Sequence, residues 1–325
     1  MRRRRFIQYV GLGGLSCALA TSTAQNVFAS PLTEISSGNS DRFNRKTFDF
    51  KVEKVNQKGI VQSHKRYTAD YFSVPVDQPS NRSDVAESID MVAITPGRFL
   101  MGTSSSDIPP ARHAVKGNEL LSHRMNVSSF FMSKYAITQA QWAAVAALPT
   151  VNRELDPNPS HFQGADYPVE SVSWLAAIEF CARLSQHTGK TYRLPTEVEW
   201  EYACRAGTQT PFHTGKTITS QHANYVGTYT YKAERPGEYR QSPVSVGSFS
   251  PNAFGLYDMH GNVWEWCSDR WHPRYQPQAG LAPTPLRTIR GGSWSDSPVN
   301  LRSASRSGYV ETGLNRTIGF RVVTT

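Results

Sequence analysis

Residues 192–208 read YRLPTEVEWEYACRAGT and contain the last stretch of the chain with a helical sequence pattern. Thr196 and Glu199 stand three positions apart directly after Pro195, a capping-box spacing that predicts the start of a helix. The apolar residues that follow on one helical face are Trp200, Ala203 and Cys204. After Gly207 no helical period recurs, and Gly, Pro, Asn, Tyr and Trp dominate. We therefore expect helices up to this stretch, and short strands with loops after it.

Two more helices are expected upstream. Thr138 and Gln141 have the same capping-box spacing and predict a short helix over residues 139–148. A second helix is expected to begin after Ser173 and to end at Gly189. Its apolar face consists of Trp174, Ala177, Ile178, Cys181 and Leu184.

Strand patterns accompany these helices. Residues 89–102, IDMVAITPGRFLMG, predict a strand, a Pro-Gly turn and another strand, and residues 125–137 predict one strand more. We interpret the whole as a compact α+β domain with an unusually high share of irregular loop. Long irregular stretches inside an ordered domain usually carry function.

The first 29 residues have the form of an export leader. Arg3, Arg4, Arg5, Phe6 and Ile7 resemble the twin-arginine signal, which is read by the twin-arginine export machinery. The apolar run that follows is too short to span a membrane, so we expect cleavage near residue 29 and no stable membrane span. A general secretory leader rich in arginine is the alternative. Either leader places the mature chain in the periplasm or outside the cell.

Three further segments follow the leader. Residues 30–46 are polar, lack any period and are expected to form a disordered linker. Residues 47–55, TFDFKVEKV, alternate strictly and precede the turn NQKG, which predicts a β-hairpin appendage with a connector over 47–88. The main domain is expected over 89–325.

Charge and cysteine content narrow the possible functions. The formal net charge is +9, and four of these charges are leader arginines, so the mature chain is near +5. No cluster of basic and aromatic residues lies outside the leader, which argues against nucleic acid as a partner. Cys181, Cys204 and Cys267 form no C-x-x-C pair, and we expect all three thiols to be buried and inert.

Several blocks of the main domain resemble the formylglycine-generating enzyme, or sulfatase-modifying factor, family in order and spacing. Besides residues 192–208 they are MVAITPGRFLMGT, KYAITQAQW, YPVESVSW, PVSVGSFSPNAFGLYDMHGNVWEW, RGGSW and IGFRVV. The resemblance covers about residues 89–323 and is similar to a cyanobacterial branch of the family. It implies a C-type-lectin-like fold, with a small twisted antiparallel sheet, flanking helices and much loop.

The same resemblance argues against the family's oxidation chemistry. The enzymes oxidise a substrate cysteine with copper held by two thiolates shortly after the Gly-Gly-Ser block, but here the corresponding places are Asp296 and the segment Asn300–Leu301. Carboxylate and amide oxygens do not replace soft thiolates for copper, so copper is not expected. Ser293 and Trp264 match groups of the enzymes' active centre and would be catalytic only if the chain is an enzyme.

A calcium site is expected around residues 258–265, DMHGNVWE. Calcium prefers oxygen ligands, which Asp258, Asn262 and Glu265 supply, and the carbonyl of Gly261 lies in the same turn. The resemblance implies a second site at Asn224. Helix or turn capping by Asp258 or Asn262 is the alternative.

Residues 290–323 contain both apparent framework and apparent surface. Relatives without the catalytic cysteines include variable proteins of diversity-generating retroelements, in which selected codons of this stretch change while the fold is kept. The framework set would be Gly291, Gly292, Trp294, Arg302, Ala304, Arg306, Gly319 and Phe320. The surface set, expected to bind a ligand, is Ser295, Asp296, Ser297, Val299, Asn300, Ser307, Gly308, Tyr309, Glu311, Thr312, Leu314 and Arg316. Small polar residues around a tyrosine are typical of binding loops, although a merely tolerant surface has the same composition.

The sequence thus predicts an exported, non-catalytic protein that binds a protein or glycan through residues 293–318. One alternative is a formylglycine-generating-type oxidoreductase that modifies a protein cysteine. The other is a structural envelope protein.

Overall fold

The computed structural model describes residues 44–76, 87–103, 122–273 and 285–325. The expected leader and all but the end of the expected linker lie outside these residues. No helix among the described residues is long and apolar enough to cross a membrane.

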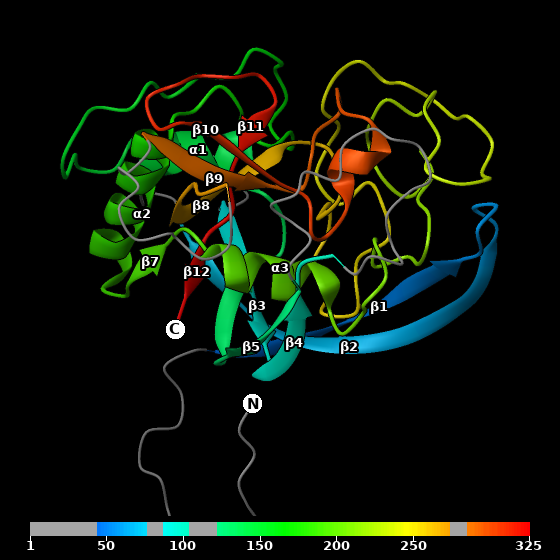
Figure 1. The fold of residues 1–325 in the computed structure, drawn as a ribbon. Helices are drawn as coiled ribbons and strands as arrows, with labels where there is room; N and C mark the ends of the chain where they lie inside the picture. Colours follow the sequence, from blue (N-terminus) through cyan, green and yellow to red (C-terminus); the bar gives the residue numbers. More distant parts are fainter. Residues whose placement is uncertain (1–43, 77–86, 104–121, 274–284) are drawn as a thin grey trace, which may run out of the picture. The chain divides into compact units, whose positions relative to one another are not determined.

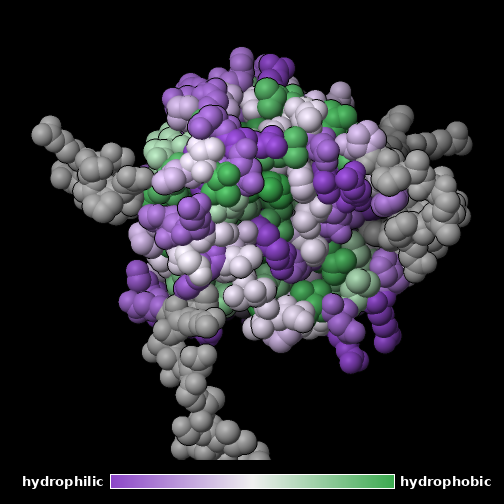
Figure 2. Space-filling model, turned by 90° about the vertical axis from the view of Figure 1, so that its left-hand side faces the viewer, coloured by the Kyte–Doolittle hydropathy of each residue, from purple (hydrophilic) through white to green (hydrophobic). Residues whose placement is uncertain are grey.

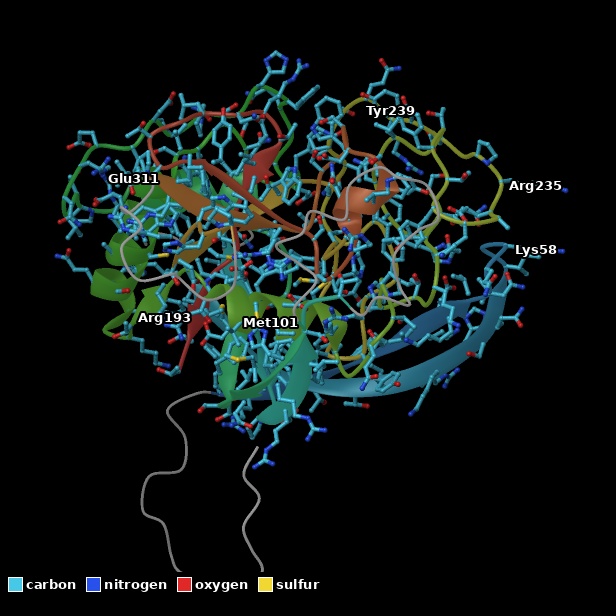
Figure 3. The ribbon with its side chains drawn as sticks, viewed as in Figure 1. Lys58, Met101, Arg193, Arg235, Tyr239 and Glu311 are labelled. Atoms are coloured by element: carbon cyan, nitrogen blue, oxygen red, sulfur yellow. The ribbon has the colours of Figure 1, made fainter. Side chains whose placement is uncertain are left out.

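The largest sheet has six strands in the order β1-β2-β3-β6-β12-β7. Its strands are β1 (Lys46–Val55), β2 (Val61–Pro75), β3 (Ser88–Ile94), β6 (Phe130–Ser133), β12 (Val323–Thr324) and β7 (Tyr192–Arg193). The hairpin predicted from the TFDFKVEKV pattern is present as β1 and β2, and its turn carries Lys58 at the right of Figure 3. Because β2 also pairs with β3, the hairpin is an extension of this sheet.

Three helices within the described ranges confirm the capping predictions: α1 (Gln139–Ala146), α2 (Trp174–Thr188) and α3 (Glu197–Arg205). Thr138, Ser173 and Thr196 each accept a hydrogen bond at the respective N-terminus. Gly189 ends α2 with φ of 70°, a left-handed conformation that glycine adopts without strain. The core beside α1 and α2 is aromatic, since Trp142 stacks on Phe180 with ring centroids 5.7 Å apart.

The second half of the domain is built from short strands and loops, as expected (Figure 1). A four-stranded sheet has the order β10-β9-β8-β11. Its strands are β8 (Trp264–Arg270), β9 (Leu286–Arg290), β10 (Arg306–Val310) and β11 (Ile318–Gly319), and the short 3₁₀ helix η3 (Pro298–Leu301) lies between β9 and β10 in sequence. The fold is the α+β, C-type-lectin-like arrangement that the sequence predicts.

One strand prediction was too coarse. The pattern over residues 125–137 contains two strands in different sheets, because β5 (His123–Val127) pairs with β4 (Gly97–Met101) whereas β6 pairs with β3 and β12. The pairing partner of each strand lies far away in sequence, so the local pattern did not reveal the division.

The surface on the α2 side of the molecule is mixed in polarity. Figure 2 shows this face, on which hydrophobic side chains gather near the centre with hydrophilic ones around them.

The three cysteines of the described residues, Cys181, Cys204 and Cys267, are free and buried, as expected. Burial raises the pKa of Cys181 and of Cys204 to about 12, so these thiols stay protonated at neutral pH.

Candidate functional site

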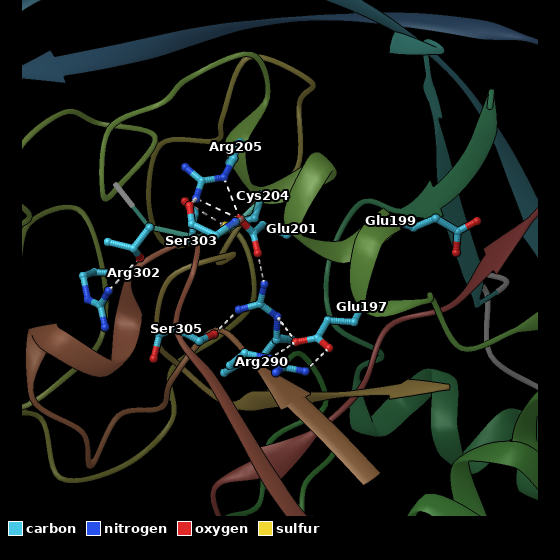
Figure 4. Close-up of polar contacts among 12 residues, drawn as sticks. Glu197, Glu199, Glu201, Cys204, Arg205, Arg290, Arg302, Ser303 and Ser305 are labelled. Atoms are coloured by element: carbon cyan, nitrogen blue, oxygen red, sulfur yellow. Dashed lines mark hydrogen bonds and ion pairs between the residues drawn. The ribbon is translucent and has the colours of Figure 1, made fainter. Parts of the chain in front are cut away.

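The stretch 192–208 anchors the C-terminal segment through buried ion pairs (Figure 4). Glu197 on α3 forms two hydrogen bonds with Arg306, of 2.5 and 2.7 Å, and lies 3.3 Å from Arg290. Glu201, one turn later, pairs with Arg290 and with Arg205, the latter at 2.8 Å. Burial acts to raise the pKa of Glu201, but the charges of Arg205 and Arg290 outweigh it and the pKa is lowered. Both ends of the loop between β9 and β10 are therefore fixed to one helix.

Sharp turns follow directly after β9. Gly291 and Gly292 have φ of 99° and 75°, values that strain any other residue. A side chain on Gly292 would also meet Leu301 at 2.7 Å. The sequence expectation that these glycines shape the backbone is consistent with this geometry.

Burial separates the framework set from the surface set. Every member of the framework set is buried, and no member of the surface set is buried. Leu314 is the most exposed large apolar side chain of the segment, at 65%. A polar, accessible surface thus lies on a buried support, although its role in ligand binding stays a prediction.

Asp296 is more constrained than a freely variable residue. Its carboxylate accepts hydrogen bonds from the Trp264 indole N–H at 2.8 Å, from the Ser293 hydroxyl at 2.5 Å and from the Asn300 amide at 2.8 Å. The Ser293 backbone N–H donates to the same carboxylate at 3.1 Å. Asp296 therefore closes a polar cluster and joins the two residues, Ser293 and Trp264, that the resemblance connects with catalysis.

Other members of the surface set also have partners in the fold. A side chain on Gly308 would lie 2.4 Å from Trp271, so this position has no room for one in the present arrangement. Tyr309 packs against Trp266, with ring centroids 6.1 Å apart, and Glu311 forms an ion pair with Arg287 at 2.9 Å. Gly308 is therefore more constrained than the rest of the surface set, and whether the set varies stays a prediction.

An aromatic cluster around Trp294 was missed by the sequence reasoning. Trp294 stacks on Tyr239 with ring centroids 6.4 Å apart and meets Phe162 edge-on at 5.5 Å. The Arg316 guanidinium lies 5.6 Å from the centroid of the Trp294 ring. Tyr239 and Phe162 come from loops that no local pattern connects to the segment. Figure 3 shows Tyr239 and Glu311 well apart across the top of the molecule.

The positions that would hold copper thiolates offer no soft ligand. Asp296 is committed to the polar cluster, and Leu301 is fully buried in an apolar group with Phe212 and Tyr225. Cys204 packs against the same segment, with its sulfur 3.5 Å from the Ser303 hydroxyl and 3.8 Å from His260 Nε2. Burial lowers the pKa of His260 to about 4, so the imidazole is neutral and does not promote thiolate formation.

The residues expected to bind calcium do not form one cage. Glu265 is paired with Arg321 through two hydrogen bonds of 2.7 Å and also accepts the Trp200 indole N–H. Asn262 Oδ1 accepts hydrogen bonds from the Asn224 amide and from the Val244 backbone N–H. Glu265 and Asn262 therefore have no side-chain oxygen ready for a cation.

Two buried oxygens of the expected set remain open. Asp258 Oδ1 and Asn224 Oδ1 have no hydrogen-bond partner among the described residues. The other Asp258 oxygen accepts the Gly247 N–H at 2.7 Å, and burial raises the pKa of Asp258 to about 6. The carbonyl of Asn224 accepts the Asn262 N–H, and Gly261 bridges to Asn224. Asp258 and Asn224 thus each have an oxygen of the kind that calcium prefers, whereas Glu265 does not have one free, and calcium binding stays a prediction.

A twisted antiparallel sheet, capped helices and a long looped C-terminal half define a protein of the C-type-lectin-like class. The chain belongs to the sulfatase-modifying factor enzyme 1-like family, whose domain model matches residues 77–325. This confirms the family indicated by the sequence blocks.

Individual relatives agree with this assignment. The chain is 30% identical to the formylglycine-generating enzyme of Mus musculus over 71% of this chain and 74% of that protein. Among solved structures, PvdO from Pseudomonas aeruginosa is 32% identical, with a TM-score of 0.60 over 73% of this chain and 94% of that chain. Treponema denticola variable protein 1 shares the fold, at 24% identity and a TM-score of 0.59 over 77% of this chain and 99% of that chain.

Proposed function

We propose that this protein is an exported, non-catalytic member of its family that binds a protein or a glycan through residues 293–318. The observation that carries the proposal is the contrast between a fully buried framework set and a surface set with no buried member. Leu314 and Arg316 are its best candidates for ligand contact, because both are exposed and neither fills the core.

The hydrogen bonds of Asp296 support the proposal that the protein does not catalyse copper–thiolate oxidation. Its carboxylate stands at a place where the related enzymes are expected to have a thiolate, and it is already hydrogen-bonded to Trp264, Ser293 and Asn300. The described cysteines are buried, with pKa values raised by burial. The competing function is formylglycine generation, which the names of several relatives state and which the family resemblance implies is oxidation of a protein cysteine.

One assay separates these two functions. The purified protein is incubated with Cu(I), oxygen, a thiol reductant and a peptide containing Cys-x-Pro-x-Arg, and the peptide mass is followed. We expect no conversion of cysteine to formylglycine. Conversion that depends on Ser293 or Trp264 would show that the chain is an oxidoreductase.

Ligand binding is tested with matched pairs of substitutions. We expect Leu314→Ala with Arg316→Ala to remove binding on a glycan array or to purified envelope proteins. The control is Val151→Ala with Arg153→Ala, which also removes an exposed aliphatic residue and an exposed arginine but lies outside the segment. Equal binding by both double variants would contradict the proposed surface and favour a structural envelope role.

We also propose that the segment is diversified by a retroelement. The expected evidence is a near-copy of the DNA for residues 293–318, differing mainly at adenines and close to a reverse-transcriptase gene. The constraint on Gly308 implies that its codon is unchanged between the two copies, whereas those of Ser295 and Leu314 differ. A genomic region without such a copy would leave a tolerant surface as the explanation.

Calcium completes the proposal. Asp258 would hold one ion through its open Oδ1, and Asn224 would contribute its open Oδ1 to a second site, each with backbone carbonyls as further ligands. Its role would be to stabilise the loops beneath the binding segment.

We further propose that the chain reaches the periplasm or the exterior through the twin-arginine machinery. Replacement of Arg3 and Arg4 by lysine in a reporter fusion would block this export.

A further inference from the structure

A groove lies at the tip of the β1–β2 hairpin. It has a volume of about 620 Å³ and is lined by residues 58–60 of the hairpin turn, by residues 219–221 and by a loop between residues 233 and 237. No residue of the segment 293–318 lines it. Its size is in the range of small-molecule and peptide sites.

The groove has a rigid wall on the hairpin side. Asn56 Oδ1 accepts the backbone N–H groups of Lys58 and Ile60, which fixes the turn. Gly59 has φ of 73°, and a side chain there would lie 2.3 Å from Thr219, so the turn directly contacts the segment that carries Thr219. The Ala233 N–H donates to the Gln57 carbonyl at 3.2 Å and ties the third segment to the hairpin.

The charge of the groove is positive. Lys58 and Arg235 are its charged lining residues, and both are exposed. Their side chains extend outward one above the other at the right of Figure 3. No carboxylate is among the described lining residues. The two carboxylates nearest in sequence, those of Glu234 and Glu238, already have hydrogen-bond or ion-pair partners. Glu234 is buried and accepts hydrogen bonds from the Thr217 hydroxyl and the Lys232 backbone N–H, and Glu238 pairs with Arg240 at 2.8 Å.

The remaining lining residues indicate the kind of ligand. Ile60 is 57% exposed and, with Pro236, offers apolar surface, while Ser220 and Gln221 offer hydrogen-bonding groups. The described lining has no aromatic ring on which a sugar could stack. Basic charge, an aliphatic contact and polar groups together suit an extended peptide with acidic and aliphatic side chains.

We propose that this groove is a binding site for an acidic peptide segment of a partner protein. Carboxylates of the peptide would pair with Lys58 and Arg235, and an aliphatic side chain would lie against Ile60. This inference is independent of the proposed role of residues 293–318, because the two surfaces share no residue.

The test uses the full mature chain and a fluorescent octapeptide of alternating glutamate and leucine, followed by anisotropy at low salt. We expect saturable binding that weakens with ionic strength. Lys58→Glu with Arg235→Glu should weaken binding at least tenfold. The control, Lys51→Glu with Arg66→Glu, makes the same charge change at an exposed cross-strand pair of the same hairpin and should weaken it less than twofold.

Three outcomes would overturn the inference. The first is equal weakening by both double variants, which indicates a diffuse charge effect. The second is no saturation by wild-type protein at millimolar peptide. The third is tighter, groove-dependent binding of polygalacturonate, which would identify an acidic glycan as the occupant. Leu314→Ala with Arg316→Ala should leave peptide binding unchanged, so a failure of this proposal and a failure of the segment proposal are distinguishable.

Discussion

Glu201 connects three parts of the chain through one buried carboxylate. It pairs with Arg205 on its own helix and with Arg290 at the end of β9, and it accepts the Gly102 N–H at 2.8 Å. A buried carboxylate is costly to desolvate, and removing it leaves two buried guanidinium groups poorly compensated. The contribution of Glu201 is therefore best measured as the loss in free energy of unfolding when its carboxylate is removed.

We expect Glu201→Gln to lower the free energy of unfolding by about 3 to 5 kcal/mol, measured by urea denaturation. The control is Glu154→Gln. Glu154 lies 3.8 Å from Arg183, but its side chain is 86% exposed, so its loss should cost about 1 kcal/mol or less. Similar losses in the two variants would show that α3 does not anchor β9 in the way described.

Gly308 provides a second prediction at this scale. Its missing side chain makes room for Trp271, which also lies under the Arg306 guanidinium at 4.6 Å from the ring centroid. We expect Gly308→Ala to displace Trp271 and to lower the free energy of unfolding by about 1 to 3 kcal/mol. The neighbouring, partly exposed Ser307→Ala should change it by about 0.5 kcal/mol at most. A fully stable Gly308→Ala protein would restore this position to the variable surface.

At the scale of elements, the hairpin joins the domain at a cluster of histidines. Val55 donates its N–H to Thr214, and Lys54 donates to the carbonyl of His213. The ring of His213 is buried, stacks on His260 at 5.0 Å, and has no hydrogen-bond partner at either nitrogen among the described residues. Burial lowers the pKa of His213 well below its usual value, and the nearby Lys54 charge acts in the same direction.

This lowered pKa has a defined consequence for stability. Below pH about 6.5 residue 213 binds a proton in the unfolded chain but not in the folded chain. The contribution of the neutral imidazole to the free energy of unfolding is therefore fully present above that pH and is lost progressively as the pH drops. The slope from this group approaches about 1.4 kcal/mol per pH unit. We expect His213→Phe to flatten the acid-side decline in urea unfolding between pH 6.5 and 4.5. The same substitution at exposed His187 should leave it unchanged, and an unaltered slope in His213→Phe would contradict the assignment.

The elements also show what the sequence could predict. Helix starts depend on Thr138, Ser173 and Thr196, whose partners lie three residues away, so these starts were predictable. Glu197 binds Arg306 more than a hundred residues further on, and no local pattern reveals such a pair. The candidate site followed the same rule. The buried framework was predicted from residue types, whereas the hydrogen bonds of Asp296 and the packing of Gly308 depend on tertiary contacts.

On the scale of the whole molecule, the structure combines two accessible surfaces with different chemistry. The C-terminal segment is polar and supported by aromatic packing, as in the contact of Trp294 with Tyr239. The hairpin groove is basic and is walled by tied turns. Two separate sites would allow the protein to bind two partners at once. If the two partners are part of one assembly, binding at the first site would raise the effective concentration of the second partner at the other site.

Calcium would act on the molecule as a whole, because binding to the folded chain alone shifts the unfolding equilibrium. We expect millimolar CaCl₂, relative to EGTA, to raise the Tm by roughly 5 °C in differential scanning fluorimetry. Asp258→Asn removes the charge while tolerating the φ of 57° at this position, and it should abolish the shift. Asp156→Asn, which neutralises an exposed carboxylate, should retain it. An equal shift in both variants would place calcium elsewhere, and no shift in the wild-type protein would mean that the open oxygens of Asp258 and Asn224 do not bind the ion.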